Sequence, residues 1–390
     1  MKMFEVIKLR NKVKSQSIVA STGIITAIIF LSLTLSFKLN AKSVAAAGNF
    51  TTNNGHIYDP DGKEFVPIGD NEFGPLASGN MDFASSANAN IYANVWKFNA
   101  IRVGVCATSQ SCYGQSNGSP VQNSTLTMID QVVNEYTSRK VVVILASFEF
   151  NGCSGFSDQW LYKVHAFNQV LADRYKSNPY VWINILNEPD PVSESQWTNL
   201  TETGIQTVRN QGNSNIIVID GADCSSDHIA DSSFNINNSF LYKHASTYSS
   251  NYGGNIVADI HTYWLGTTPK GLTIQQAGDQ LAGFAQTMQA QKGIPVIVGE
   301  FPPAINETLA ASSRVYADLD QAVKNAAYAA KMGIFAWSPS NDGNGDVRST
   351  MGLQNSSQDL KFWTINKTDG TKPTNLTYGG SMLWDMAHDP

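Results

Sequence analysis

The stretch Val181–Pro189 reads VWINILNEP, an apolar run that ends at an asparagine, a glutamate and a proline. A near-continuous apolar run is typical of a parallel strand that is buried on both faces. The stretch Ile294–Pro302, IPVIVGEFP, repeats this pattern later in the chain and also reaches a glutamate. A parallel α/β barrel builds its active site at the carboxyl ends of its strands. We therefore expect Glu188 and Glu300 to lie together at that face of such a fold.

Working outward from these two stretches, short Val- and Ile-rich runs occur at moderately regular spacing, which favours strands. The predicted strands are Phe65–Gly69, Ala100–Val105, Val141–Phe148, Val181–Leu186, Ile216–Asp220, Ile256–Ile260, Pro295–Val298 and Gly333–Trp337. Segments with helical periodicity lie between them. The predicted helices are Ser124–Ser138, Gln159–Tyr175, Trp197–Gln211, Thr273–Lys292 and Leu319–Met332.

Strands and helices that alternate about eight times predict an α/β fold, a (β/α)8 TIM barrel in a single domain. An open doubly wound sheet is the alternative, but the Gly-x-Gly-x-x-Gly turn of its dinucleotide-binding form is absent from the sequence. Before the first strand, His56–Phe65 reads as a hairpin with its turn at Pro60–Gly62. We expect this hairpin to plug the bottom of the barrel.

Residues 1–47 are predicted to be a targeting segment outside the fold. Basic residues come first, an uncharged stretch runs from Ser15 to Phe37, and Ala45–Ala47 supply small residues for signal peptidase. The uncharged stretch is also long enough to span a bilayer, so an amino-terminal membrane anchor at residues 15–37 is the alternative. In both cases we expect residues 48–390 to form the catalytic domain outside the cytoplasm, secreted or held at the outer face of the membrane.

The sequence has four cysteines, Cys106, Cys112, Cys153 and Cys224. In an oxidising compartment an even number predicts disulfide bonds, and four cysteines allow three pairings. All four lie at or just past predicted strand ends on one face of the barrel. We favour Cys112 with Cys153, because that pair joins neighbouring loops. Their spacings do not match a zinc site, and we expect no metal and no cofactor.

Two glutamates that face each other across one cleft are the minimum equipment for cleaving a glycosidic bond. Asn-Glu-Pro after one strand and Val-Gly-Glu-Phe on a later one resemble glycoside hydrolase family 5, the cellulase family of clan A. The resemblance covers about residues 56 to 345 and includes, in order, Ile101–Val103, His261–Trp264 and Phe335–Trp337. It implies a TIM barrel and an enzyme that hydrolyses the O-glycosidic bonds of a β-linked glycan.

The resemblance also implies catalytic roles. Glu300 matches the nucleophile and Glu188 the general acid/base of a retaining double displacement. Glu300 must stay ionised, and Arg102 and the hydroxyl of Tyr263 are the donors that the family supplies for it. Pro189 disfavours a helical conformation for the residue before it, and we expect Glu188 to be extended.

The substrate-binding residues follow from the same match. Asn187 is expected to bind the sugar hydroxyl next to the reacting carbon, and Trp337 to stack on the sugar. His261 alternates with the tyrosine two residues on, so both side chains can face the cleft. The chain departs from the family after the third strand, where a histidine is common. Glu149 or Asn151 is the candidate to replace it.

The favoured substrate is β-1,4-glucan, as for an endo-β-1,4-glucanase, with β-mannan next. The alternatives are an exo-acting β-glycosidase or transglycosylase on the same barrel, or a catalytically silent carbohydrate-binding surface protein. The net charge of −6 and the absence of a basic stripe disfavour nucleic acid as a partner, and we expect none. We expect a monomer whose partner is a carbohydrate, with membrane contact only if the leader stays attached.

Overall fold

The computed structural model describes most of the chain after the leader. The described residues are 48–72, 81–106, 121–148, 158–189, 193–229, 231–263, 271–301, 316–337, 371–373, 376 and 378–389. Residues 1–47 are not among them, so the choice between a signal peptide and an anchor stays a prediction. No helix in the described ranges is both long enough and apolar enough to cross a membrane.

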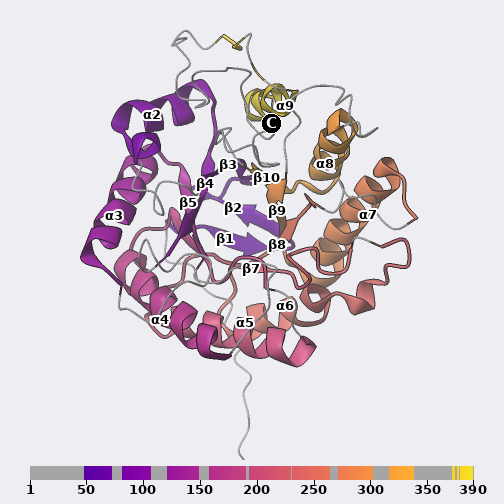
Figure 1. Ribbon diagram of the computed structural model, residues 1–390, viewed down its shortest axis with the longest axis horizontal. Coiled ribbons are helices and arrows are strands. Elements are labelled where there is room, and N and C mark those ends of the chain that lie inside the picture. Colours follow the sequence, from indigo (N-terminus) through magenta and orange to yellow (C-terminus); the bar gives the residue numbers. More distant parts are fainter. Residues whose placement is uncertain are drawn as a thin grey trace, which may run out of the picture. The chain divides into compact units, whose positions relative to one another are not determined.

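Parallel strands close into a barrel in the order β10-β3-β4-β5-β6-β7-β8-β9, and helices surround it (Figure 1). The strands are β3 Ile68–Glu72, β4 Ala100–Val105, β5 Val142–Ser147, β6 Val181–Asn184, β7 Ile217–Asp220, β8 Ile256–His261, β9 Val296–Phe301 and β10 Gly333–Ala336. The (β/α)8 prediction is confirmed. A closed barrel has no open edge, so the doubly wound alternative is excluded.

The first barrel strand was predicted three residues too early, at Phe65 instead of Ile68. The N–H of Phe65 donates to the carbonyl of Ile57 at 2.8 Å, so this residue belongs to the hairpin and not to the barrel. Pro67 follows and has no N–H to donate to a neighbouring strand. Local apolar content could not separate the end of the hairpin from the start of the strand.

Two consecutive hairpins lie at the amino-terminal end of the barrel, and the sequence predicted only the second of them, His56–Phe65. Strand β1, Thr51–Asn53, pairs antiparallel with β2, His56–Tyr58, and both lie across the centre of the ring in Figure 1. The predicted turn at 60–62 follows, with an antiparallel bridge between Tyr58 and Glu64.

The plug is aromatic. The ring of Phe50 is 1% exposed and meets the rings of Phe65, Tyr180 and Trp182 edge-on, at centroid distances of 5.0, 5.1 and 5.4 Å. Trp182 points into the barrel from β6, so Phe50 joins the hairpin to the barrel interior.

We expect Phe50→Leu to lower the free energy of unfolding by about 1.5 kcal/mol, since it keeps an apolar side chain but loses three aromatic contacts. Urea denaturation followed by fluorescence measures the change. Tyr328→Leu is the matched control, because Tyr328 is 47% exposed and should change stability by less than about 0.5 kcal/mol. Equal effects of the two substitutions would contradict a stabilising plug.

The helices of the ring are α2 Ser86–Asn90, α3 Asn123–Thr137, α4 Asp158–Tyr175, α5 Glu194–Arg209, α6 Phe240–Asn251, α7 Ile274–Thr287, α8 Tyr316–Ala330 and α9 Tyr378–His388. The predicted helices correspond to α3, α4, α5, α7 and α8. Thr273 caps α7 through a capping box with Gln276. The sequence did not predict α6 or α9, because the apolar spacing of α6 is interrupted by polar residues and α9 is short.

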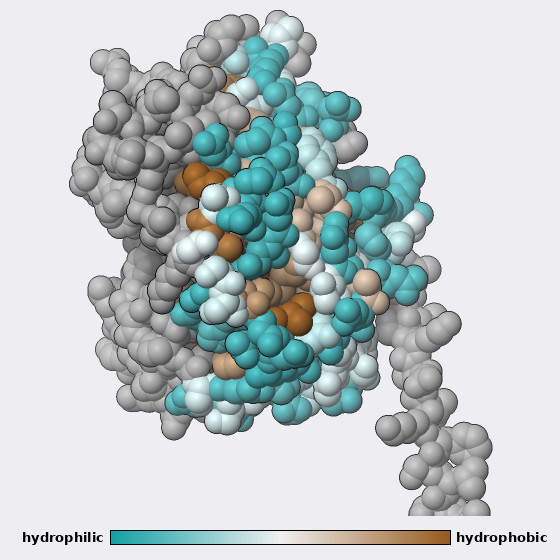
Figure 2. All heavy atoms as spheres, turned by 90° about the vertical axis from the view of Figure 1, so that its right-hand side faces the viewer, coloured by the Kyte–Doolittle hydropathy of each residue, from teal (hydrophilic) through white to brown (hydrophobic). Residues whose placement is uncertain are grey.

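The face of the molecule on the right of Figure 1 is mostly hydrophilic, with hydrophobic residues scattered between polar ones (Figure 2). Among the residues that the structure describes, Tyr328 is the one large hydrophobic side chain that is exposed. Isolated apolar residues on a surface are normal and do not mark an interface.

Candidate active site

The barrel interior has an apolar floor and a polar upper layer. Its floor is built from inward-facing residues near the strand starts, including Ala100, Val142, Trp182 and Val257. Side chains alternate along a strand, so the inward position two residues further along each of these strands belongs to the next layer. On three of those strands that position holds Arg102, Asn184 and Asp259, which are all buried.

Arg102 lies at the centre of the polar layer and is fully buried. Its Nη1 donates to Glu300 Oε1 at 2.7 Å and to Asn71 Oδ1 at 3.0 Å. Its Nη2 donates to Asn184 Oδ1 at 2.9 Å and to Asn187 Oδ1 at 2.7 Å. Burial alone would lower the pKa of Arg102, but the surrounding carboxylates outweigh it and raise that pKa. The guanidinium therefore stays charged.

Glu188 and Glu300 come together as predicted. A carboxylate oxygen of each lies within 4.8 Å of the other and of a ring nitrogen of His261. The Glu300 side chain is 4% exposed and that of Glu188 is 16% exposed, so solvent reaches Glu188 more readily.

Glu300 accepts hydrogen bonds from the two residues that the sequence suggested. Tyr263 Oη donates to Oε2 at 2.8 Å, and Arg102 contacts the other oxygen. Burial nevertheless raises the pKa of Glu300 to about 7, and the charge of Glu188 adds to the rise, whereas His261 and Arg102 oppose it. The same burial, together with the neighbouring carboxylates, raises the pKa of Tyr263, so its hydroxyl keeps its proton and acts as a donor.

His261 bridges the two carboxylates from the end of β8. Its Nδ1 lies 2.8 Å from Glu188 Oε1 and 3.7 Å from Glu300 Oε2. Burial lowers the pKa of His261, but the nearby negative charges raise it well above its usual value. The imidazole therefore lies against both carboxylates, whereas the sequence suggested only a sugar-binding role for it.

The remaining predicted residues lie around this cluster. Asn187 is buried, and its Nδ2 donates to Glu188 Oε2 at 3.4 Å. Trp337 follows β10, is half-buried, and stacks against Phe148 with ring centroids 6.1 Å apart. Glu149 and Asn151, the candidates to replace the missing histidine, lie outside the described residues.

Pro189 had suggested an extended backbone at Glu188. The structure instead places this residue in the left-handed region, with φ of +48°. The restriction that a proline places on the preceding residue disfavours a right-handed helix and does not forbid this region. The N–H of Glu188 donates to Asp220 Oδ2 at 2.9 Å, and this contact is made possible by the turn of the chain.

Sequence reasoning missed four buried polar residues beneath the carboxylates, namely Asn71, Asn184, Asp220 and Asp259. Asn184 and Asp259 stand within otherwise apolar runs, which was the available signal, whereas Asp220 ends β7 and Asn71 lies at the polar end of β3. Asp259 explains the glycine before Glu300, because the N–H of Gly299 donates to Asp259 Oδ1 at 2.6 Å. A Cβ at Gly299 would lie 2.1 Å from Asp259 Oδ2, which is too close for any other residue.

Two groups of described side chains are close enough to share a cation, Glu188 with His261 and Glu300, and Asp220 with Asp259 and His261. Arg102 Nη2 lies 3.9 Å from Asp220 Oδ2 and Arg102 Nε lies 3.7 Å from Asp259 Oδ2. These carboxylates therefore already face a buried positive charge, and we assign no metal to them.

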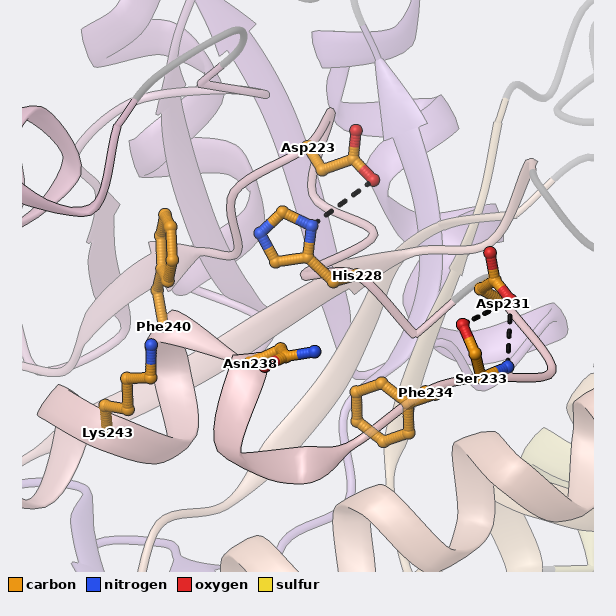
Figure 3. A pocket seen from close by; sticks show the side chains of 8 residues that line it. All are labelled: Asp223, His228, Asp231, Ser233, Phe234, Asn238, Phe240 and Lys243. Atoms are coloured by element: carbon orange, nitrogen blue, oxygen red, sulfur yellow. Dashed lines mark hydrogen bonds and ion pairs between the residues drawn. The ribbon is translucent and has the colours of Figure 1, made fainter.

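A separate cavity of about 540 Å³ lies beside the segment that follows β7 (Figure 3). In Figure 3, Asp223 and His228 lie together on one side and Asp231 and Ser233 on another. No predicted site residue lines it. The lining residues are Asp223, His228, Asp231, Ser233, Phe234, Asn238, Phe240 and Lys243.

Neither Cys106 nor Cys224 is a free thiol in the structure. Cys112 and Cys153, the favoured pair, lie outside the described residues. The pairing stays a prediction.

Two close carboxylates at the carboxyl end of a (β/α)8 barrel define the site of a glycosidase. The chain matches the model of the cellulase family, glycosyl hydrolase family 5, over residues 59–343. It therefore belongs to glycosyl hydrolase family 5, whose members hydrolyse O-glycosyl bonds, and the resemblance seen in the sequence is confirmed.

The individual relatives have low sequence identity to the chain. The chain is 22% identical over 297 residues to a mannan endo-1,4-β-mannosidase of Streptomyces lividans, a match that covers 73% of this chain and 66% of that protein. Among solved structures, the mannanase catalytic domain of Streptomyces sp. SirexAA-E is 20% identical with a TM-score of 0.61, covering 89% of this chain and 91% of the other. The catalytic domain of a Thermobifida fusca endoglucanase is 16% identical with a TM-score of 0.59, covering 88% and 98%. These structures support the fold.

Proposed function

We propose that this chain is a retaining β-glycanase in which Glu300 is the nucleophile and Glu188 the general acid/base. The observation that carries the proposal is the separation of the two carboxylates, whose nearer oxygens lie within 4.8 Å. Retaining enzymes hold the two carboxyls about 5–5.5 Å apart, whereas inverting enzymes leave about 6.5–9.5 Å for a water molecule.

In the first step a Glu300 oxygen attacks the anomeric carbon, and the bond from that carbon to the leaving oxygen breaks. Glu188 donates its proton to the leaving oxygen. In the second step Glu188 takes a proton from water, whose oxygen attacks the same carbon and releases Glu300. Two inversions leave the configuration of the sugar unchanged.

The environment of each carboxylate suits its step. Arg102 and Tyr263 both contact Glu300 and stabilise it as an anion when it leaves the sugar. The more exposed Glu188 is open to the water molecule from which it takes a proton in the second step. In this proposal Asn187 binds the hydroxyl beside the reacting carbon, and Trp337 packs on the sugar ring.

We propose β-1,4-mannan as the substrate, cut internally, because the curated relative is an endo-acting mannosidase. The second candidate is β-1,4-glucan, which the match to the cellulase family model favours. The two sugars differ in configuration at one hydroxyl, so side chains around that hydroxyl decide between them. Fold alone does not.

The test is hydrolysis of galactomannan, glucomannan and carboxymethylcellulose with sizing of the products. Release of mixed short oligosaccharides from galactomannan with no release from carboxymethylcellulose supports the mannanase, and the reverse supports the glucanase. Proton NMR of the first products reports the anomer. Inverted products would contradict the double displacement, and failure on all three polymers and on aryl β-glycosides would favour a silent carbohydrate-binding protein.

We expect an acid limb in the pH profile of kcat/KM with an apparent pKa of about 7, because Glu300 must lose its proton before it attacks. Activity at pH 5 should be roughly 100-fold below the plateau. The apparent pKa of this acid limb belongs to the cluster of interacting groups and not to one residue. Tyr263→Phe removes a donor that lowers the pKa of Glu300, so it should move the limb to higher pH. A limb near pH 4.5 in both proteins would contradict this.

We further propose that the enzyme is secreted after cleavage near residue 47, acts as a monomer, and carries two disulfide bonds. The basic and uncharged parts of residues 1–47 support this proposal, as does the absence of free thiols among the described cysteines. Mass spectrometry of the native and reduced protein from culture medium tests all three points. A product that keeps residues 15–37 and stays with membranes would favour the anchor.

A further inference from the structure

Asp220 ends strand β7 beneath the proposed acid/base, and no step of the mechanism above uses it. Its side chain is fully buried and accepts three hydrogen bonds. Oδ2 accepts from the N–H of Glu188 at 2.9 Å and from Ser225 Oγ at 2.8 Å. Oδ1 accepts from Asn184 Nδ2 at 2.5 Å. A carboxylate, which only accepts, is the side chain that three donors require.

The first of these donors belongs to a residue in an unfavourable conformation. Glu188 has φ of +48°, and a left-handed residue other than glycine costs roughly 1–2 kcal/mol. Such a conformation persists only where its surroundings determine it. The contact from its N–H to Asp220 holds the Glu188 backbone directly. The contact from His261 Nδ1 to Glu188 Oε1, at 2.8 Å, holds the other end of the side chain.

The segment after β7 is also left-handed, with positive φ at Asp223, Cys224, Ser225, Asp227 and His228. Ser225 connects this turn to the site twice, because its hydroxyl donates to Asp220 while its carbonyl accepts from the N–H of His261 at 3.0 Å. The outer end of the same turn lines the cavity in Figure 3. Two unfavourable backbone segments thus meet at one carboxylate.

We infer that Asp220 is a positioning residue that fixes the left-handed backbone of Glu188, so that proton transfer to the leaving oxygen depends on Asp220. This inference rests on the proposed function. Asp220 does not reach the sugar. It acts through Glu188 and, by way of Ser225, on the turn that carries the strain.

Asp220→Asn keeps the size of the side chain but places an N–H where one of three donors now points. It also removes a negative charge that lies 3.9 Å from Arg102 Nη2 and 3.8 Å from His261 Nε2. A buried donor that faces another donor costs about 1–3 kcal/mol. The N–H of Glu188 is the partner least able to adjust, because a hydroxyl or a side-chain amide can rotate and a backbone cannot.

The experiment compares two aryl β-glycosides with the same sugar, one with a dinitrophenyl and one with an unsubstituted phenyl leaving group. Departure of dinitrophenolate needs no proton, whereas departure of phenolate does. Because kcat/KM reports the first chemical step, we expect Asp220→Asn to lower it about 30-fold or more for the phenyl glycoside. For the dinitrophenyl glycoside we expect a change of less than about threefold.

Glu188→Ala is the reference, because it must show the same dependence on the leaving group more strongly. If Glu188→Ala lowered kcat/KM equally for both substrates, the acid/base assignment itself would be wrong. That outcome separates failure of the proposed function from failure of this inference. Asp227→Asn is the matched control. Asp227 is a buried aspartate in the same turn that anchors the start of α6 through the N–H of Phe240 at 3.1 Å. Its substitution should leave the ratio of the two substrates unchanged.

Ser225→Ala supplies a second test that does not remove a buried charge. It should shift the ratio in the same direction by about fivefold, since Asp220 keeps two of its three donors. Equal losses on both substrates in Asp220→Asn and Ser225→Ala would show a merely structural role and overturn the inference. An unchanged ratio with full activity in both variants would overturn it as well.

Discussion

Glu300→Ala is expected to lose hydrolysis of aryl β-glycosides by on the order of 10⁴-fold or more in kcat/KM. The reason is geometric. Glu300 is 4% exposed at its side chain and held by Arg102 at 2.7 Å and by Tyr263 at 2.8 Å. Asp220 and Asp259, two other acids on the barrel strands, are fully buried against Arg102 and His261, so we do not expect them to replace the nucleophile. The measurement is initial rates at pH 8, where the wild-type carboxylate is ionised.

Azide separates the two glutamates. In Glu300→Ala a small anion can occupy the space of the lost carboxylate and attack the anomeric carbon once, giving a glycosyl azide of inverted configuration. In Glu188→Ala azide can attack only the covalent intermediate on Glu300, which gives a glycosyl azide of retained configuration. The same product from both variants would contradict the assignment of nucleophile and acid/base. A Glu300→Ala protein that keeps a tenth of wild-type activity would contradict the role of Glu300.

The architecture was predictable from the sequence because strand and helix each leave a local signature. The apolar run at 181–186 predicts β6, and the similar run after Gly293 predicts β9. Element boundaries were less predictable. Phe65 is as apolar as a strand residue, and only its hydrogen bond to Ile57 shows that it belongs to the hairpin. Neither strand length nor the position of Glu300 inside β9 can be read from composition.

The upper part of the site was predictable through the family resemblance, and the layer beneath it was not. The resemblance predicted Arg102 and Tyr263 as donors to Glu300, and both hydrogen bonds are present. Asp220 and Asp259 were read only as strand residues. Their role arises when eight strands close and bring positions that are distant in sequence around one guanidinium. The left-handed backbone of Glu188 was also missed, because Pro189 disfavours only the right-handed helical region and does not select between the other allowed regions.

Arg102→Met is expected to be the most destabilising single change in the barrel, by about 3–5 kcal/mol. Arg102 is fully buried and donates to four side chains. Methionine fills most of the space but removes the guanidinium charge that, together with His261, offsets the charges of Glu300 and Asp220. Urea denaturation at a fixed pH measures the loss. Arg174→Met is the matched control, because Arg174 is 41% exposed and pairs with Asp130 at the surface, where such pairs contribute about 0–1 kcal/mol.

The loss of stability in Arg102→Met should depend on pH, and the raised pKa values of the buried carboxyls set the direction of that dependence. Burial raises the pKa of Glu300 to about 7 and that of Asp220 to about 6, and the charge of Arg102 lowers both. Without Arg102 both pKa values rise further. A carboxyl whose pKa is higher in the folded state than in the unfolded state favours folding at low pH and opposes it as pH rises.

The stability gap between wild type and Arg102→Met should therefore be widest above pH 7 and should narrow as pH falls to about 5, where both folded proteins hold these protons. What remains at low pH is the loss of four hydrogen bonds. Arg102→Lys separates the two contributions, since it keeps the charge but loses the planar fork of donors. It should show a gap that varies little with pH. A gap in Arg102→Met that widens toward low pH would mean that these carboxylates are ionised and paired with another cation, and would remove Arg102 from the centre of the site.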